Sequence, residues 1–332
     1  MAEVTMYDVA KKAGVSVGTV SNVINFPARV RPSTLKHVLT VIDELGFVPK
    51  TEALARARKN MGRIGVLAPF STYVSFEQRL RGVMHALQDQ PFELVLYDQQ
   101  SMAVRNDYLS SLPISKRLDG LIVMAMGFDE RVEQRLLSRE LETVLVDISR
   151  PAFSRVETDN FAGGRLAAEY LIAKGHRRCA FIGEQHTPVT VPTALSTFRQ
   201  DGFRQTFAEA GIDLPVEYIS LGAYGMEQAQ HQAHTLLSLP EPPTAIFAYS
   251  DIQAIGVLEA ARERGLTVPD DLAVIGFDDL DIAQYLRLTT IRQPLVESGQ
   301  VAVQLLLDRL RDPTCPIQSV ILPLQVVERS TA

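Results

Sequence analysis

The chain has 332 residues, of which 46% are hydrophobic and 22% are charged, and its formal net charge is −6 at pH 7. This composition is typical of a soluble globular protein that can bury more than one core. No long uncharged apolar run and no secretory signal layout occur, so we expect no membrane span and a cytoplasmic location. The only cysteines, Cys179 and Cys315, are far apart, which argues against a disulfide framework or a thiolate metal site.

The charge is unevenly distributed along the chain. Residues 1 to 60 contain nine Lys or Arg and five Asp or Glu, a net charge of +4. The remaining residues carry 24 basic and 34 acidic side chains, a net charge of −10. A small basic module on an acidic body is the asymmetry expected when only the module meets nucleic-acid phosphates.

Three short helices are predicted in residues 1–49. Thr5 caps a first helix over Tyr7–Ala13, and Gly14 allows a tight turn. Ser16 caps a second helix, and a third begins at residues 32–34 and ends at Gly46. The apolar positions expected to face one small core are Val9, Ala10, Ala13, Val20, Val23, Ile24, Leu35, Val38, Leu39, Ile42 and Leu45.

The turn AGVS between the first two helices is typical of a helix-turn-helix, which presents its second helix to the DNA major groove. Asn22 can pair with adenine, Val17 can contact a thymine methyl group, and Gly18 permits close approach. Tyr7, Ser16, Thr19, Ser21 and Asn25 suit contacts to phosphates. The alternative for each polar residue is a solvated helix cap.

The segments VTMYDVAKKAGVSVGTVSNVIN and RVRPSTLKHVLTVIDELGFVPK resemble the headpiece of the lactose-repressor (LacI/GalR) family of bacterial transcription regulators. The resemblance implies that Val17, Gly18 and Asn22 face the bases of double-stranded operator DNA. It also implies backbone contacts by Thr5, Tyr7, Ser16, Thr19, Ser21, Asn25 and Thr34, and we add Arg29 to the DNA-binding set.

Residues 50–61 correspond to the family's hinge but depart from its pattern. The family carries a stretch like ALARSL, whose last leucine wedges into the minor groove, whereas this chain reads TEALARARKN. Arg56 or Arg58 takes the leucine position, depending on the alignment. Because arginine does not unstack a base step as an apolar wedge does, we expect weaker operator bending, or a wedge formed by Leu54. The alternative is a flexible basic linker.

The body, residues 62–332, alternates strand-like runs with helical patterns. Eight runs, from RIGVLAP to LAVIGF, indicate right-handed βαβ units in two doubly wound parallel-sheet halves, with a break near SRPAFSRVETDN. LTTIRQP, the helix VESGQVAVQLLLDRLRD and SVILPLQVV are expected to cross back between the halves. The predicted fold class is therefore α/β, with an N-subdomain at about 62–157 and 291–318 and a C-subdomain at about 158–287 and 322–332.

Ligands of open parallel sheets bind beyond the carboxyl ends of the strands. The residues directly after strands include Pro69, Phe70, Ser250, Asp251, Asp278 and Asp279. No phosphate-binding glycine loop, zinc-protease motif or nucleophile elbow occurs, so we expect no enzyme and no cofactor. His231 and His234 are interpreted as solvated side chains.

DNFAGGRLAAEYLIAKGHRRCAFIG, FRQDGF, PPTAIFAYSD and GLTVPDDLAVIGFDD resemble the same family's effector domain, which is similar to periplasmic sugar-binding proteins. By this resemblance Arg199 and Asp278 grip the effector. Pro69, Tyr224, Ser250 and Gln293 occupy neighbouring pocket positions, and Ser250 replaces the usual asparagine. Asp251 is expected to cap the following helix, and Asp279 to cap or bridge locally. Phe70, Tyr73, Phe76 and Phe161 either line the cleft or belong to the core, and the core is favoured because aromatics near strand ends are usually buried there.

The sequence therefore predicts a homodimeric regulator, usually a repressor in this family, that binds operator DNA and responds to a sugar or related metabolite. A protein corepressor is the alternative partner. The C-terminal sequence carries no leucine-heptad segment, which favours a dimer over a tetramer. A transport binding protein would need a signal peptide, and an enzyme would need a catalytic motif.

Overall fold

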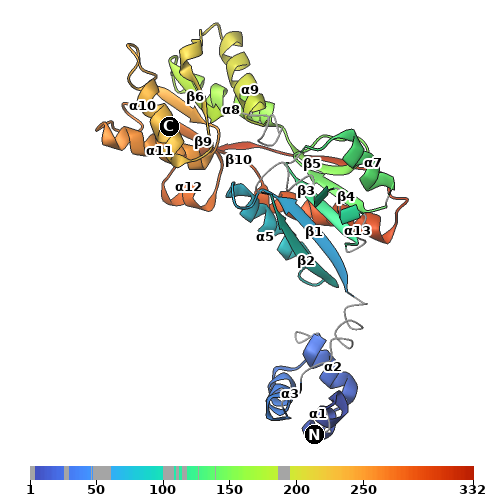
Figure 1. Ribbon diagram of the computed structural model, residues 1–332. Helices are drawn as coiled ribbons and strands as arrows, with labels where there is room; N and C mark the ends of the chain where they lie inside the picture. The colour runs from blue at the N-terminus through green and yellow to red at the C-terminus, as the bar shows by residue number, and fades with distance from the viewer. Residues whose placement is uncertain are drawn as a thin grey trace. The chain divides into compact units, whose positions relative to one another are not determined.

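The computed structural model describes residues 4–25, 30–45, 47, 61–99, 108–109, 112–113, 118–125, 127–138, 140–185 and 195–332 (Figure 1). The chain divides into two compact units, one formed mainly by Met1–Gly62 and one comprising the rest of the chain apart from Pro91–Glu93. We call them the headpiece and the body. The expected hinge lies outside the described residues except for Met61.

The headpiece contains α1 (Met6–Ala13), α2 (Val17–Asn25) and α3 (Pro32–Leu45). Thr5 forms a capping box with Asp8, and Ser16 Oγ accepts a 3.1 Å hydrogen bond from the Thr19 amide, so both predicted caps are confirmed. Gly14 adopts a left-handed φ of 64° in the turn. The core comprises Val9, Ala10, Ala13, Val20, Val23, Val38, Val41 and Phe47.

One predicted core position of α3 is wrong. Leu39 is 44% exposed, and Val41 is buried instead. Residues at i, i+3 and i+4 share one face of a helix, and Val38, Val41 and Ile42 have this spacing. Leu39 lies about 100° around the helix from Val38 and therefore points away from that face.

The body has two lobes, each built on a six-stranded sheet. The first lobe has the strand order β11-β5-β4-β3-β1-β2. Its strands are β1 (Gly62–Ala68), β2 (Phe92–Asp98), β3 (Gly120–Met124), β4 (Glu142–Val146), β5 (Ser154–Thr158) and β11 (Ser319–Leu322). Its helices include α5 (Ser75–Leu87), α7 (Glu130–Ser138) and α13 (Leu295–Arg311).

The second lobe repeats this arrangement with the order β12-β10-β9-β8-β6-β7. Its strands are β6 (Cys179–Glu184), β7 (Ile219–Gly222), β8 (Ala245–Ala248), β9 (Ala273–Asp278), β10 (Thr289–Arg292) and β12 (Gln325–Val327), and a 3-10 turn, η2 (Val216–Tyr218), precedes β7. Its helices are α8 (Asn160–Ala173), α9 (Leu195–Glu209), α10 (Met226–Leu236), α11 (Asp251–Glu263) and α12 (Asp281–Tyr285). β12 pairs antiparallel with β10, whereas β10 pairs parallel with β9.

Alternate residues of the same strand enter different cores of the second lobe. In β6, Ala180 and Ile182 pack with Ala233 of α10, whereas Cys179 and Phe181 pack against α8 and α9. Because strand side chains alternate between the two faces, a sheet buried on both faces needs an almost continuous apolar run. The prediction of two doubly wound halves is therefore confirmed.

The crossings between the lobes differ in detail from the expectation. Strand β5 lies within the segment interpreted as the break, and it pairs with β4. SVILPLQVV forms two strands, β11 in the first sheet and β12 in the second. Residues 289–292 belong to the second sheet and 319–322 to the first, so the expected N-subdomain range of 291–318 is displaced by a few residues.

Glycines allow close helix contacts in both lobes. A Cβ atom on Gly82 of α5 would lie 1.9 Å from the Val296 carbonyl oxygen of α13, and one on Gly299 would lie 2.1 Å from the Arg79 carbonyl oxygen. Gly164 of α8 and Gly202 of α9 form the corresponding contact in the second lobe, where an added Cβ atom would lie 2.0 Å from the Arg199 and Phe161 carbonyl oxygens respectively. Each pair brings two helix backbones together where a larger residue would hold them apart.

Candidate functional site

The outer face of α2 is solvent-exposed, as a DNA-reading face requires. Val17 is 38% exposed although it is apolar, and Tyr7 of α1 is 69% exposed. Thr5, Ser16, Gly18 and Asn22 are exposed, and Thr19, Ser21 and Thr34 are half-buried. Arg29, Leu54, Arg56, Arg58 and the side chain of Asn25 lie outside the described residues.

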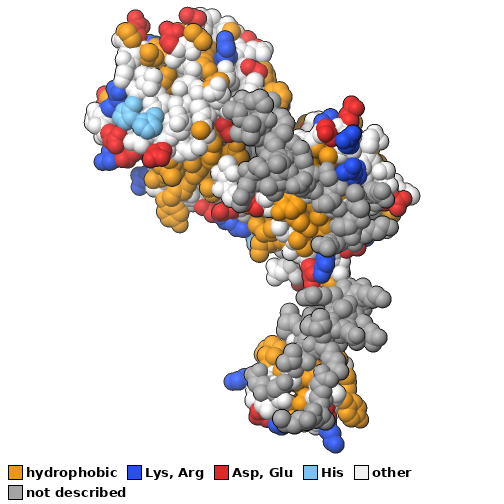
Figure 2. Space-filling model, in the orientation of Figure 1, with side chains coloured by type: hydrophobic (Ala, Val, Ile, Leu, Met, Phe, Trp, Pro, Cys, Tyr) orange, Lys and Arg blue, Asp and Glu red, His pale blue; other side chains and the backbone are white. Residues whose placement is uncertain are grey.

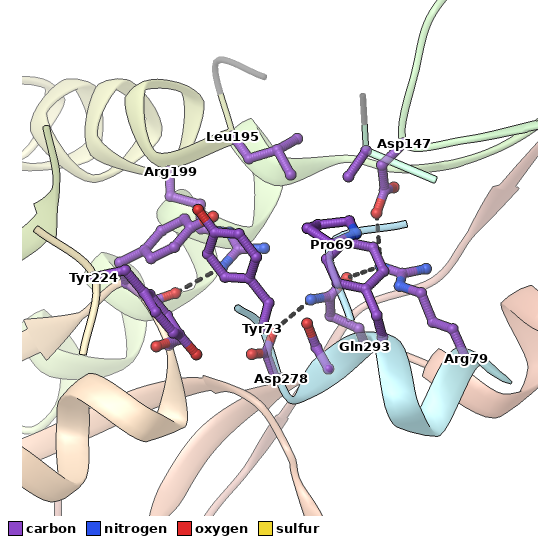
Figure 3. A pocket seen from close by; sticks show the side chains of 14 residues that line it. Pro69, Tyr73, Arg79, Asp147, Leu195, Arg199, Tyr224, Asp278 and Gln293 are labelled. Carbon is purple, nitrogen blue, oxygen red and sulfur yellow. Dashed lines mark hydrogen bonds and ion pairs between the residues drawn. The ribbon is translucent and has the colours of Figure 1, made fainter. Parts of the chain in front are cut away.

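A pocket lies between the two lobes of the body, beyond the carboxyl ends of strands from both sheets. The empty space between its lining atoms is about 540 Å³ when the part that is open to solvent is included. Pro69 follows β1, Ala125 follows β3 and Asp147 follows β4, whereas Ser250 comes soon after β8 and Asp278 ends β9. In each sheet the strand order reverses beside β1 or β6, so the pocket lies where open α/β sheets bind ligands. Its lining residues are Pro69, Tyr73, Ser75, Phe76, Arg79, Ala125, Asp147, Leu195, Arg199, Tyr224, Tyr249, Ser250, Asp278 and Gln293 (Figure 3).

Arg199 of α9 supplies the positive charge on the side of the pocket that the second lobe forms. It is only 3% exposed. Its Nε donates to Asn160 Oδ1 at 2.8 Å, and its Nη1 donates to the Tyr249 carbonyl oxygen at 2.6 Å. The guanidinium carbon lies 3.5 Å from the centre of the Phe277 ring. These contacts fix the planar group, so that it can present its remaining donors in one orientation.

Asp278 is the carboxylate of the same region. It is 5% exposed, and its Oδ1 accepts a 2.5 Å hydrogen bond from Gln293 Nε2. Burial raises the pKa of Asp278 to about 6, whereas the charge of Arg199 and the Gln293 bond act in the opposite direction. Its φ of 118° is a backbone conformation that side-chain-bearing residues seldom adopt, which is common at ligand sites.

A second cation, Arg79 of α5, lines the first lobe's side. Arg79 Nη2 lies 2.6 Å from Asp147 Oδ2, and both side chains are 4% exposed. Nη2 also donates to Gln293 Oε1 at 3.1 Å, and Nη1 donates to Ser298 Oγ at 2.7 Å. Figure 3 shows the resulting row from Asp147 through Arg79 and Gln293 to Asp278.

Aromatic rings form the apolar part of the pocket. The rings of Tyr73 and Tyr224, from different lobes, have centres 4.5 Å apart. Tyr73 also donates a 2.7 Å hydrogen bond to Glu184 Oε1 at the end of β6. Burial raises the pKa of both tyrosines, so both hydroxyl groups stay protonated.

The turn around Ser250 corrects one expectation. Ser250 caps α11, with its Oγ accepting from the Gln253 amide at 3.2 Å, whereas Asp251 is the first helical residue. Asp251 is fully buried and accepts hydrogen bonds from Thr290 Oγ1 at 2.5 Å and from the Leu280 amide at 2.7 Å. Its carboxylate therefore supports the turn that carries Asp278. Asp279 bridges Arg292 and Arg329, as one of its two expected roles.

All six residues expected at the effector site, Pro69, Arg199, Tyr224, Ser250, Asp278 and Gln293, line this one pocket. Sequence reasoning missed Arg79 and Asp147, and it favoured the core over the cleft for Tyr73 and Phe76, which line the pocket. Tyr73 lies in the loop after β1 and Asp147 follows β4 directly, so the strand-end rule could have found these two, whereas Arg79 lies within α5. Phe161 lines a separate surface hollow on the second lobe.

No group of potential metal ligands occurs among the described residues. His231 is exposed, as expected, but His234 takes part in a surface network, with Nε2 2.9 Å from Glu263 and Nδ1 accepting from Arg264. None of the helices in the described part of the chain combines the length and apolarity needed to cross a bilayer.

A helix-turn-helix headpiece joined to a two-lobed body with a polar interlobe pocket defines a ligand-responsive DNA-binding protein. Residues 5–50 match the family described as "Bacterial regulatory proteins, lacI family". Residues 168–332 match the family described as "Periplasmic binding protein-like domain".

Similar proteins agree with these matches over the whole chain. The HTH-type transcriptional repressor PurR of Photobacterium profundum is 32% identical, covering 93% of this chain and 92% of that protein. Catabolite control protein A of Priestia megaterium is 31% identical, covering 99% of both chains. A solved structure described as a "transcriptional regulator CelR-cellobiose complex" has a TM-score of 0.72 at 27% identity, covering 99% of this chain and 100% of that one.

The chain belongs to the lacI family of bacterial regulatory proteins. It is a transcription regulator with a DNA-binding headpiece and an effector-binding body, and it is not an enzyme.

Proposed function

We propose that this protein is a homodimeric repressor of the cytoplasm, whose affinity for its operator changes when a neutral, hydroxyl-rich metabolite, a sugar or a close relative, binds between the lobes. The observation that carries the proposal is the buried pair of Arg199 and Asp278 in a pocket that both lobes line. Because the two lobes share the ligand, its binding favours one relative placement of the lobes.

The chemistry of the pocket supports a neutral effector with hydroxyl groups. Its lining contains two cations, Arg79 and Arg199, and two carboxylates, Asp147 and Asp278, so formal charges balance when all four are ionised. Guanidinium donors and carboxylate acceptors can hold hydroxyl groups of one ligand, and the Tyr73 and Tyr224 rings offer apolar surface. Ser250 supplies one hydroxyl where the family resemblance implies an asparagine amide, and its Oγ is already engaged in capping α11.

We assign direct base contacts to Val17, Gly18 and Asn22. Thr5, Tyr7, Ser16, Thr19, Ser21, Asn25, Arg29 and Thr34 are assigned to the phosphate backbone. The exposure of the described members of this set is compatible with these roles. Phosphate contacts position the headpiece, and contacts to base edges provide specificity.

We propose further that the arginines of residues 50–61 reduce operator bending relative to family members that carry a leucine wedge. Arg56 or Arg58 takes the wedge position in the sequence. The test is a bending assay on the cognate operator with wild type and Leu54→Ala. A sharp central kink that persists in Leu54→Ala would contradict the proposal.

Homodimer formation would cover apolar surface on the body. Figure 2 shows hydrophobic side chains gathered over α12, where Ile282 is 42%, Tyr285 83% and Leu286 39% exposed. Apolar patches of this kind mark interaction sites, and a second copy of the chain is the partner that a near-palindromic operator requires. Sedimentation equilibrium of wild type and Tyr285→Asp tests this, and a wild-type monomer would refute it.

The experiment that tests the function measures operator binding with and without a ligand panel. Fluorescence anisotropy with operator DNA is measured with ribose, cellobiose, glucose 6-phosphate and adenine. We expect one neutral sugar-like compound to change operator affinity at least tenfold, and Arg199→Ala, checked for folding by circular dichroism, to lose that response. A response to glucose 6-phosphate alone would refute the neutral class, and no response to any compound would favour a protein corepressor.

A further inference from the structure

The proposed function uses the Arg79–Asp147 pair only as part of the pocket lining, and the contacts that the pair makes away from the pocket are not explained by it. A buried ion pair is weak evidence for stability, because desolvating two charges offsets much of their attraction. Arg79 Nε is also buried, and no protein group in the described part of the chain accepts a hydrogen bond from it. Buried donors without a protein partner are rare in native structures, so the contacts of Arg79 need an explanation beyond the stability of the fold.

The contacts of Arg79 converge on the segments that connect the lobes. Asp147 Oδ1 accepts a 3.0 Å hydrogen bond from the amide of Thr158, the last residue of β5 before the chain enters the second lobe. Gln293 follows β10 and precedes α13, where the chain returns to the first lobe. Thr158 Oγ1 donates to Gln293 Oε1 at 3.2 Å, so the two connecting segments are joined beside Arg79.

This arrangement sets the orientation of the Gln293 amide. Its Oε1 accepts from Arg79 Nη2 and from Thr158 Oγ1, so its Nε2 must point the other way. There Nε2 donates to Asp278 Oδ1. An amide rotated by 180° would place its oxygen against the carboxylate and its NH₂ group against the guanidinium, which are both repulsive contacts.

We propose that Arg79 is a positioning residue of the effector site: it fixes the Gln293 amide, through which it holds Asp278 as a hydrogen-bond acceptor for the effector. The proposal rests on the proposed function of the pocket. Since Gln293 and Thr158 lie on two connecting segments, a ligand that takes over the Asp278 carboxylate also changes the contact that joins the lobes. Arg79 thereby makes effector binding dependent on the lobe connections.

The test separates positioning from simple neutralisation of Asp147. Arg79→Met alone leaves Asp147 buried without a counter-charge, and we expect a large fall in melting temperature. Arg79→Met/Asp147→Asn removes both charges and restores most of the lost stability. Asparagine suits position 147 because the backbone there has a left-handed φ of 55°, and its side-chain oxygen can still accept from the Thr158 amide.

The first readout is the pKa of Asp278, measured by NMR on the full chain with ¹³C-labelled aspartate and assigned with Asp278→Asn. Groups facing Asp278 include Arg199 of α9, Arg79 of α5, Asp147 after β4, Tyr224 before α10, Tyr249 after β8, and Asp251 of α11. The charge of Arg79 lowers the pKa and that of Asp147 raises it, so the double variant removes two opposing influences. Because Arg79 has the larger influence of the two, their removal alone raises the pKa somewhat, and only a rise as large as that in Gln293→Leu would report the misplaced Gln293 amide.

The second readout is operator binding with ribose, cellobiose, glucose 6-phosphate and adenine. For whichever of these compounds acts on wild type, we expect the double variant to need at least tenfold more. Gln293→Leu should reproduce this loss, whereas Ser298→Ala, which removes a different Arg79 contact, should not. A stable double variant in which the Asp278 pKa rises less than in Gln293→Leu overturns the proposal. If none of the four compounds changes operator binding by the wild type, that result contradicts the proposed function instead. The pKa of Asp278 in the double variant then still decides the role of Arg79.

Discussion

The hydroxyl group of Tyr73 in the first lobe donates a 2.7 Å hydrogen bond to the Glu184 carboxylate in the second lobe. The same ring packs against Tyr224, also in the second lobe. Tyr73 therefore contacts the opposite lobe through both its polar and its apolar parts, and it does so at the pocket. This contact stabilises the closed arrangement of the lobes.

Tyr73→Phe should favour lobe opening while keeping the ring contact. A hydrogen bond to a charged group contributes about 1.5–3 kcal/mol, so closure should weaken by about tenfold or more. Small-angle scattering of the body should show a larger radius of gyration for the variant. Tyr218→Phe, which removes a 2.6 Å hydrogen bond to the Glu241 carbonyl oxygen within the second lobe, is the matched control. An unchanged radius for Tyr73→Phe would contradict the role.

The difference in the free energy of unfolding between Asp278→Asn and wild type should shift in favour of the variant as pH rises. The pKa of Asp278 is about 6 in the folded protein, above the ordinary 3.8, so the unfolded chain loses this proton first. Below about pH 4 the carboxyl is protonated in both states and its raised pKa does not reduce the free energy of unfolding. As the pH rises to about 6, this free energy falls by roughly 2–3 kcal/mol because the buried group must ionise. Urea unfolding at pH 4 and pH 7.5 checks this; an equal difference between the two proteins at both pH values would argue against a raised pKa.

Gly82→Ala should destabilise the first lobe by about 3 kcal/mol or more. The added methyl group would lie 1.9 Å from the Val296 carbonyl oxygen, and a helix backbone cannot move aside as a side chain can. Thermal unfolding followed by circular dichroism measures the loss. Glu77→Gln, an exposed change in the same helix, should stay within about 0.5 kcal/mol of wild type. A stability of Gly82→Ala close to that control would mean that the two helices can separate without cost.

Asn22→Ala should weaken binding to the cognate operator by about 1–3 kcal/mol and leave non-specific DNA binding nearly unchanged. The reason is that a base contact contributes only on the right sequence, whereas phosphate contacts act on every sequence. Anisotropy titrations with operator and scrambled duplexes measure the two affinities. Thr40→Ala, an exposed change on α3, is the control. An equal loss on both duplexes would assign Asn22 to the phosphates.

The helices of the headpiece and the strands of the body could be predicted because local features encode them. Thr5 and Ser16 cap helices with side chains a few residues from the amides that they bind, and apolar runs such as RCAFIG form strands buried on both faces. Strand ends also predicted Pro69, Ser250 and Asp278, because parallel strands bring their carboxyl ends to one edge. The resemblance to the family added Arg199, Tyr224 and Gln293.

The tertiary structure alone decided which residues meet across the pocket. Arg79 and Asp147 are 68 positions apart, and Arg79 and Gln293 are 214 apart, so no local pattern pairs them. Tyr73 and Phe76 have the hydrophobic character of core residues, so the sequence left the choice between core and cleft open, and the tertiary structure places them in the lining of the pocket. Strand β5 and the split of residues 319–327 between two sheets likewise depend on where the chain crosses between lobes. Caps and periodicity act over a few residues, whereas these contacts form only after three crossings have brought both lobes together.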